Sequence, residues 1–286
     1  MKTIIPYLYL LFLLMLGAAC SDDDLDSRSI FDTSSPERTP FDNWLISNYT
    51  NPYNIDFIYR LEDIETDMKY RLVPADLDKS VQLAKLVKHL WLEAYDEAAG
   101  IEFTRTYVPR TIQLVGSAAY ENNGTMVLGT AEGGLKVTLY LVNSLQLNID
   151  FLNYYYFKTM HHEFGHILHQ TRSYQTEFQL VSEADYVGGD WYQEQEYHQK
   201  GFVSQYAMNG ADDDFVENIA VYVTNTEEEW QEILTIAGDS GREILLKKFE
   251  MVKEYMQNTW NIDLTQLRDI VLRRAKDIEK LNLDEL

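Results

Sequence analysis

Cysteine, basic side chains and long apolar segments are scarce in this chain. Cys20 is its one cysteine, so no disulfide can form within the chain. The 24 Lys and Arg residues stand against 46 Asp and Glu residues, a formal net charge of −22, and such an acidic surface disfavours nucleic acid and anionic lipid as partners. The apolar run of residues 4–16 is short for a membrane-spanning helix, which needs about 20 residues.

The N-terminal region has the layout of an exported lipoprotein. A basic start, the apolar run and a stretch of small residues precede Cys20, in the order of a secretory signal. The cysteine at this place resembles a bacterial lipobox, although Gly17 stands where that pattern usually has leucine. Ser21–Asp24 resembles the surface-export signal of Bacteroidetes lipoproteins. The sequence predicts a signal peptide over 1–19, a lipidated flexible tether over 20–40, and an outer-membrane lipoprotein at the cell surface, attached to the membrane only through Cys20.

The motif H-E-x-x-H begins at His162, within a segment, Phe151–Thr171, that is predicted to be one buried helix. Residues four apart lie on the same face of a helix, so the imidazoles of His162 and His166 can bind one metal ion. Glu163 can then reach a water molecule bound to that ion, which is the arrangement of a metal hydrolase. We therefore predict one Zn²⁺ per chain, with His162 and His166 as ligands and Glu163 as general base.

The third zinc ligand is open on the residues alone. Glu183, seventeen residues after His166, could bind from a second helix. Asp213 and Glu217 are four apart on another predicted helix, so one could bind the metal while the other hydrogen-bonds to a ligand histidine. Tyr206, seven residues before Asp213, could enter the site as a phenolic donor. This later group is favoured, because a solvated helix start would not explain the apolar residues around Glu217.

His169 does not fit the ion that His162 would bind. Seven residues of continuous helix rise by about 10.5 Å, whereas the ligands of one zinc lie within about 4 Å of each other. Longer motifs of this kind have a glycine at the place of His169 and a last histidine where this chain has Arg172. His169 is therefore interpreted as a residue that supports the site, contacts substrate or is structural.

The rest of the pattern predicts an α+β fold in two lobes over residues 41–286. A first lobe, to about residue 172, contains a helix ending near Ala99, a small mixed sheet and the motif helix. A first strand is predicted before the helix that ends near Ala99, at Met68–Val73, and the others within a β-rich region 101–143, at Thr111–Val115, Gly124–Leu128 and Leu135–Val142. The second lobe is predicted to be mainly helical, with helices at Ser182–Gln195, Asp212–Thr224, Glu227–Ala237, Gly241–Asn258 and Thr265–Leu281.

Three motifs together resemble a known family. His162–His166, Phe202–Ala207 and Asp213–Glu217 are similar to the zinc-binding metallopeptidases of Bacteroidetes, also described as substrate-import-associated zinc metallohydrolase lipoproteins. The later two motifs are also similar to anthrax lethal factor and to the Pro-Pro endopeptidases. The resemblance implies a zincin-like fold, with Tyr206 as oxyanion donor, Asp213 as third zinc ligand and Glu217 as its support.

One departure from that family bears on function. The family usually has glutamate where this chain has Asp213, which is one methylene shorter, so the backbone comes closer to the metal, or Glu217 binds it, or binding is weaker. The resemblance implies a metallopeptidase that cleaves a peptide or protein substrate with a zinc-activated water. Two alternatives stay open: a zinc amidase acting on peptidoglycan or glycoprotein fragments, and a non-catalytic binding lipoprotein, with a zinc-bound or decayed site, that assists an outer-membrane nutrient-import complex.

Overall fold

The structure is a computed structural model that describes residues 37–61, 69–122, 124–127, 129–132 and 135–286. The chain divides into two compact units, 1–38 and 39–286, and the second holds every helix and strand given below. The predicted signal peptide and Cys20 lie outside the described residues. Within those residues, no helix has both the length and the apolar character to cross a membrane.

Three long helical segments of the first lobe each contain a π-helical turn, and the backbone stays helical through it. They are α2 (Pro40–Leu45), η1 (Ile46–Thr50) and α3 (Asn51–Tyr53); α4 (Leu77–Val87), η3 (Lys88–Leu92) and α5 (Glu93–Ala99); and α7 (Ile149–Leu152), η5 (Asn153–Phe157) and α8 (Lys158–Thr171). Gly100 ends α5 with φ +88°, a conformation that favours glycine. The predictions of helices up to about Ala99 and over Phe151–Thr171 agree with the second and third segments.

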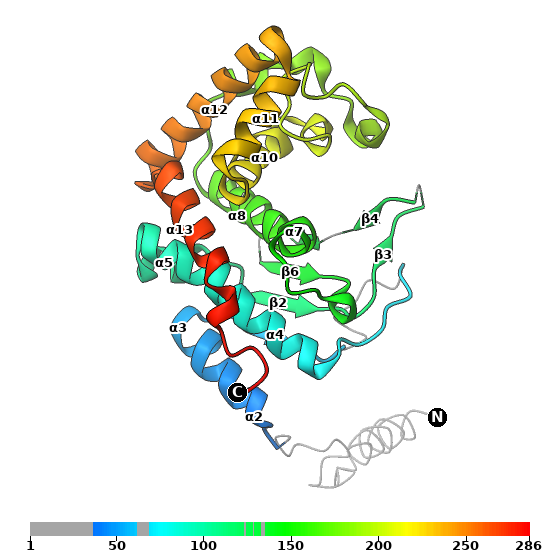
Figure 1. Ribbon diagram of the computed structural model, residues 1–286, viewed down its shortest axis with the longest axis vertical. Coiled ribbons are helices and arrows are strands. Elements are labelled where there is room, and N and C mark those ends of the chain that lie inside the picture. The colour runs from blue at the N-terminus through cyan, green and yellow to red at the C-terminus, as the bar shows by residue number, and fades with distance from the viewer. Residues whose placement is uncertain (1–36, 62–68, 123, 128, 133–134) are drawn as a thin grey trace, which may run out of the picture. The chain divides into compact units, whose positions relative to one another are not determined.

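A small mixed sheet lies beneath the motif helix (Figure 1). Its strands, in spatial order, are β1 (Asp56–Ile58), β2 (Thr111–Leu114), β6 (Lys136–Leu139) and β5 (Gly129–Glu132). The first three are parallel, and β5 pairs antiparallel with β6. Ile112, Gln113 and Leu114 are consecutive and all buried, so β2 is covered on both faces. A separate two-stranded sheet pairs β3 (Ala119–Tyr120) with β4 (Met126–Val127).

Two sequence predictions in this lobe are wrong. Residues 69–73, the described part of the predicted strand Met68–Val73, form no strand. Ile101–Tyr107 forms a helix, α6, at the start of the region predicted to be β-rich. Its β-branched residues favour strand, but Phe103 and Tyr107 pack edge-on against Trp260 of a later helix, and this tertiary contact outweighs local preference.

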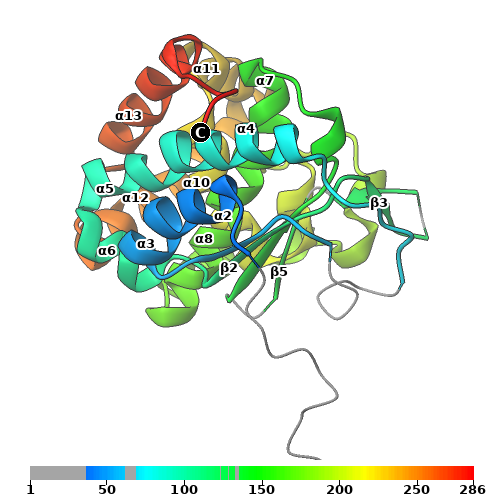
Figure 2. The ribbon, with the colours of Figure 1, turned by 90° about the horizontal axis from the view of Figure 1, so that it is seen from below.

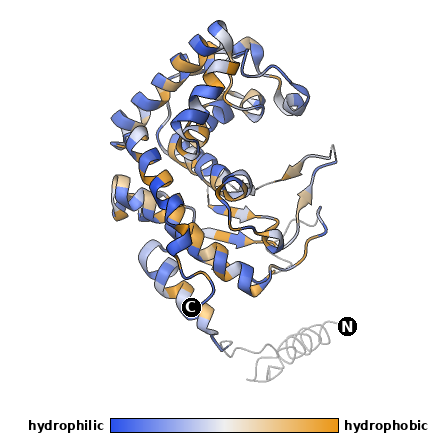
Figure 3. Cartoon of the chain, viewed as in Figure 1, coloured by the Kyte–Doolittle hydropathy of each residue, from blue (hydrophilic) through white to orange (hydrophobic). Residues whose placement is uncertain are grey.

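The second lobe is helical, as predicted. It contains α9 (Glu177–Val181), η6 (Glu183–Asp185), η7 (Gly188–Gln193), η8 (Tyr206–Asn209), α10 (Ala211–Thr224), α11 (Glu227–Ile236), α12 (Gly238–Trp260), α13 (Leu264–Lys276) and η9 (Ile278–Lys280). Thr226 and Glu229 form a capping box at the start of α11. Hydrophobic and hydrophilic residues alternate along α12 and α13, as expected of amphipathic helices (Figure 3). Together the lobes form an α+β fold.

The predicted helix Ser182–Gln195 is wrong. Its residues form only the short 3₁₀ turns η6 and η7. Gly188 has φ +60°, and Gly189 follows it, so two residues of low helix propensity lie in the middle of the segment. This segment instead runs over the surface as a connection that leads to η8.

The fold brings α8 against α10, and against β5 on another side (Figures 1 and 2). Gly129 of β5 lies so close to α8 that an added Cβ would be 2.7 Å from Cγ2 of Thr159. Gly165 of α8 is equally close to α10, since a Cβ there would be 2.9 Å from Cβ of Val216. These contacts hold the motif helix between the sheet and the acidic first turn of α10.

Candidate metal centre

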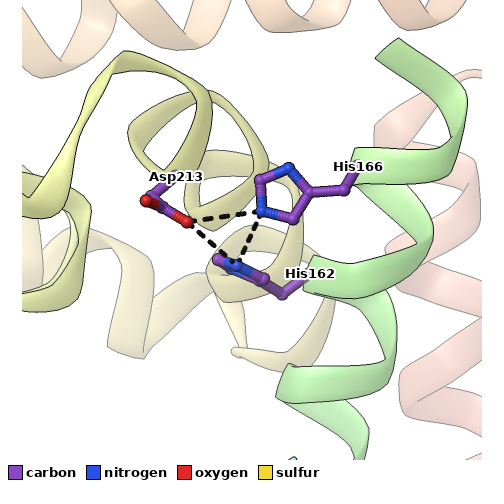
Figure 4. A group of neighbouring side chains, drawn as sticks. All are labelled: His162, His166 and Asp213. Carbon is purple, nitrogen blue, oxygen red and sulfur yellow. Dashed lines mark hydrogen bonds and ion pairs between the residues drawn. The ribbon is translucent and has the colours of Figure 1, made fainter. Parts of the chain in front are cut away.

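Two helices bring three metal-binding side chains to one point (Figure 4). His162 and His166 lie one turn apart on α8, and their Nε2 atoms are 3.1 Å apart. Asp213, in the first turn of α10, places Oδ1 3.5 Å from Nε2 of His162 and 3.3 Å from Nε2 of His166. Among the described residues this is the only group of three or more His, Cys, Asp or Glu side chains so arranged.

The three atoms have the spacing that zinc requires. A tetrahedral ion with bonds of about 2.0–2.1 Å has ligand atoms about 3.3–3.4 Å apart, and the observed separations are 3.1, 3.3 and 3.5 Å. Two imidazole nitrogens and one carboxylate oxygen are also a donor set typical of hydrolytic zinc, with the fourth position left for water. The side chains present therefore fit a zinc ion.

The electrostatics of the group favour a positive charge at its centre. Glu217 accepts a hydrogen bond from Nδ1 of His162, at 2.9 Å from Oε1, so the other nitrogen of a neutral His162 carries a lone pair. Although burial lowers the pKa of His162, hydrogen bonds with Asp213 and Glu217 raise it to about 9. Burial raises the pKa of Asp213, but hydrogen bonds from His162, His166 and Asn209 bring it below its usual value. The site thus attracts a proton, which a bound metal would displace.

Glu217 supports the group from behind. Its side chain is 1% exposed, and Lys158 donates to Oε2 at 2.8 Å. Burial raises the pKa of Glu217, but the charge of Lys158 and the hydrogen bond from His162 lower it below the usual range. Because Glu217 faces Nδ1 of His162 rather than Nε2, it lies outside the group of converging atoms and fixes the orientation of a ligand candidate.

His169 orients His166 as Glu217 orients His162. Its Nε2 lies 2.9 Å from Nδ1 of His166, so a proton on Nδ1 leaves the lone pair of His166 on Nε2, facing the centre. The ring of His169 packs edge-on against Tyr174 and Phe215, which holds it in place.

His161 lies outside the group. It is fully buried on the other side of α8, where its Nδ1 is 3.0 Å from the hydroxyl of Tyr95.

Glu163 and Tyr206 border the group without being part of it. Glu163 is half-buried, and burial raises its pKa, an effect that the positive charge of the neighbouring histidines opposes. Tyr206, on η8, has its ring 5.5 Å from that of His162 and is packed edge-on by Trp191 at 5.0 Å. Burial, with Asp213 and Glu163 nearby, raises the pKa of Tyr206, so the phenol keeps the proton that a hydrogen-bond donor needs.

The structure also bears on the choice of third ligand. Glu183 is exposed on η6 and is not part of the converging group. Asp213 is, and Asn209 donates to its other oxygen at 2.6 Å. Asp213 reaches both histidines although it is one methylene shorter than the family's glutamate, and α10 lies close to α8 at Gly165. Of the three explanations for that departure, the geometry disfavours metal binding by Glu217, which faces Nδ1 of His162.

Sequence reasoning missed three supporting residues. Lys158, on the same face of α8 as His162 and one turn before it, could have been found from its spacing of four. Ser204, whose hydroxyl donates to Glu217, lies in the motif Phe202–Ala207 but carried no role there. Asn209 precedes the acidic helix and had no signal in the sequence beyond its type.

Comparison with known proteins identifies the family of the chain. No match was found among curated proteins. One solved structure, a "putative zinc-binding metallo-peptidase" from Bacteroides caccae ATCC 43185, is similar, with 48% sequence identity and a TM-score of 0.78; the match covers 90% of this chain and 99% of that one. A family model described as "Putative zinc-binding metallo-peptidase" matches residues 34–265. The chain therefore belongs to this family of zinc-binding metallo-peptidases.

Proposed function

We propose that the protein is a zinc-dependent peptidase in which His162, His166 and Asp213 hold the metal. The observation that carries this proposal is the convergence of their three ligand atoms at 3.1–3.5 Å. A glutamate directly after the first histidine supports catalysis rather than storage of the ion, because Glu163 is not needed to bind it.

The residues around the centre have complementary parts in hydrolysis. When bound, zinc would supply Lewis acidity, which lowers the pKa of a water molecule and polarises a carbonyl group. Glu163 accepts the proton of the attacking water and delivers it to the leaving amine. Burial favours this exchange, because a raised pKa makes the Glu163 carboxylate a better proton acceptor. The hydroxyl of Tyr206 donates a hydrogen bond to the oxyanion that forms from the scissile carbonyl.

Exchange of Glu163 for glutamine tests this assignment. Glu163→Gln keeps the size of the side chain but removes its basicity, so zinc content stays near one per chain while peptide hydrolysis is lost. Elemental analysis and a peptide-library digest measure the two properties, with Glu228→Gln on the exposed face of α11 as the matched control. Retained hydrolysis in the Glu163→Gln protein, with contaminating protease excluded, would refute the role of Glu163.

The peptide-library digest separates the peptidase from the other two candidate functions. An amidase acting on peptidoglycan or glycoprotein fragments would bind zinc and depend on Glu163, yet leave the peptide library intact. A binding lipoprotein that assists an import complex would hydrolyse no peptide, and Glu163→Gln would leave its ligand binding unchanged. The intact Glu163 beside the converging ligands favours the two enzymes over the binding protein.

The place of action is a separate proposal. The arrangement around Cys20 supports a lipid anchor in the outer membrane and exposure at the cell surface, where an outer-membrane nutrient-import complex is the proposed partner. Cys20→Ala then releases the protein from membranes in cell fractionation, and continued membrane association would contradict the anchor. Accessibility of the wild type to protease added to intact cells tests surface exposure, and co-purification of import components from detergent extracts tests the partner.

A further inference from the structure

Ser204 connects two parts of the proposed site that come from different elements. Its hydroxyl donates to Oε2 of Glu217, which in turn holds His162, and it accepts a hydrogen bond at 3.2 Å from the backbone amide of Ala207. We propose that Ser204 is a positioning residue that couples the zinc ligand His162 to the oxyanion donor Tyr206. This inference rests on the proposed function, which supplies both roles.

The Glu217 carboxylate fixes the direction of the Ser204 hydroxyl. Its Oε2 accepts hydrogen bonds from both Lys158, at 2.8 Å, and the Ser204 hydroxyl. The proton of Ser204 must therefore point at Glu217, and its lone pairs are left for the amide of Ala207. Serine hydroxyls usually rotate freely to suit their surroundings, so a hydroxyl fixed on both sides transmits displacement from one side to the other.

The second contact fixes the backbone of the turn that carries Tyr206. Ala207 directly follows Tyr206, and a serine that accepts from the amide three residues on is a typical start of a helical turn. The turn η8 is short, and Tyr206 reaches the ring of His162 from it. A change in the backbone at Ala207 would therefore move the phenol away from the place where an oxyanion forms.

Contacts other than those of Ser204 also hold the turn. Gln205 donates from Nε2 to the carbonyl oxygens of Tyr192 and Glu194, at 2.9 and 2.6 Å, and so fastens the turn to the preceding segment. Lys158 keeps Glu217 paired when the serine is absent. Ser204→Ala should thus give a folded protein in which Tyr206 and His162 each keep their other contacts but are no longer coupled to each other.

Hydrogen exchange of the Tyr206–Asn209 amides, followed by mass spectrometry with and without zinc, tests the coupling without any assay of activity. In the wild type, zinc orders His162, Glu217 and Ser204, and slows exchange of this turn by about threefold or more. In Ser204→Ala, zinc still binds but the protection disappears. Ser204→Thr keeps the hydroxyl and restores the protection, and Ser204→Cys, a weak donor, loses it and serves as a second variant should alanine prevent folding.

Ser182→Ala is the matched control. Ser182 is buried, whereas Ser204 is half-buried, and the Ser182 hydroxyl has no hydrogen-bond partner in the part of the chain that the structure describes, so its removal leaves the zinc-dependent protection unchanged. Three outcomes would contradict the coupling. The zinc-dependent protection could persist in Ser204→Ala, it could be lost equally in Ser182→Ala, or it could be absent from the zinc-loaded wild type. A serine needed only for stability would raise exchange by the same factor with and without zinc, which also contradicts the coupling.

Kinetics supply a second readout that separates this inference from the proposed function. Ser204→Ala lowers kcat by about tenfold and leaves KM within about twofold, since the misplaced phenol is needed mainly in the transition state. In a Tyr206→Phe background the effect of Ser204→Ala falls below about twofold, because no donor remains to be misplaced. Equal effects in both backgrounds overturn the coupling. Zinc-dependent protection in a protein that hydrolyses no peptide refutes the peptidase and leaves the coupling supported.

Discussion

Helices α8 and α10 each contribute two polar residues four apart to the site, but the two pairs behave differently. His162 and His166 both turn Nε2 to the same point. Asp213 and Glu217 have the same spacing, yet Asp213 faces that point and Glu217 faces Nδ1 of His162. Equal spacing therefore places each pair on one helix face without deciding whether both members reach the metal.

The surroundings of the two carboxylates explain the difference. Asp213 is in the first turn of α10, half-buried, with Asn209 as its neighbour. Glu217 lies one turn deeper, is 1% exposed, and is bound by the cation Lys158 and the hydroxyl of Ser204. A buried carboxylate needs such donors to stay charged, and these donors draw Glu217 to the back of His162.

Replacing each carboxylate in turn should have the largest effects on zinc affinity. Asp213→Ala takes away a proposed ligand, so zinc affinity falls by more than the roughly 10–100-fold typical for loss of a partner behind a ligand. The loss of zinc affinity in Glu217→Ala should lie within that range. Competition with a chromophoric zinc chelator measures both, and Glu183→Ala, on an exposed turn, serves as control with unchanged affinity. A larger loss in Glu217→Ala, or in Glu183→Ala, would transfer the ligand role to that residue.

The distance between α8 and α10 can be changed at Gly165. Gly165→Ala puts a Cβ 2.8 Å from Cγ1 of Val216, so α10 must move away. We expect a loss of stability of about 1–3 kcal/mol and a lower zinc affinity, because Asp213 no longer reaches the centre. Adding Asp213→Glu should recover affinity, since the longer side chain spans the wider gap. Urea denaturation and chelator competition measure the two effects.

Gly189→Ala is the control for that experiment, because nothing lies within 4 Å of a Cβ added at Gly189. It should alter neither stability nor zinc affinity beyond error. Should Asp213→Glu bind zinc more tightly than wild type with Gly165 unchanged, the close approach of the helices is not what lets aspartate reach the metal.

Lys158→Met, on α8, should have the smallest effect, because it acts on the site only through Glu217. It removes one of the donors to Glu217 while Ser204 and His162 remain, and the Lys158 side chain is 30% exposed, so solvent screens part of its charge. Zinc affinity should fall by less than about tenfold, below the usual effect of losing a direct partner of a ligand. Lys253→Met, which breaks an exposed ion pair with Glu250 on α12, is the control. A loss as large as that of Glu217→Ala would show that Lys158 alone keeps the carboxylate in place.

Elements with strong local signals could be predicted from the sequence, and those that depend on distant partners could not. The motif helix, α10 to α13 and the strands β2 and β6 have clear periodicity, and the structure contains them. Ile101–Tyr107 has the β-branched residues of a strand but is a helix, because its aromatic side chains pack on Trp260. The short strand β1 is part of the sheet only through its pairing with β2, about 55 residues later in the chain.

For the candidate site, the sequence by itself determined which residues can do the chemistry: the two histidines of α8, the glutamate between them, a tyrosine and an acidic helix. Side-chain type and helical spacing are local properties, and they suffice for that. Only the tertiary structure decided that Asp213 faces the centre while Glu217 lies behind His162, and that Ser204 joins Glu217 to the turn of Tyr206. These relations depend on how closely α8 and α10 pack, and that packing involves residues far apart in sequence: Gly165, which has no side chain, leaves room for Val216.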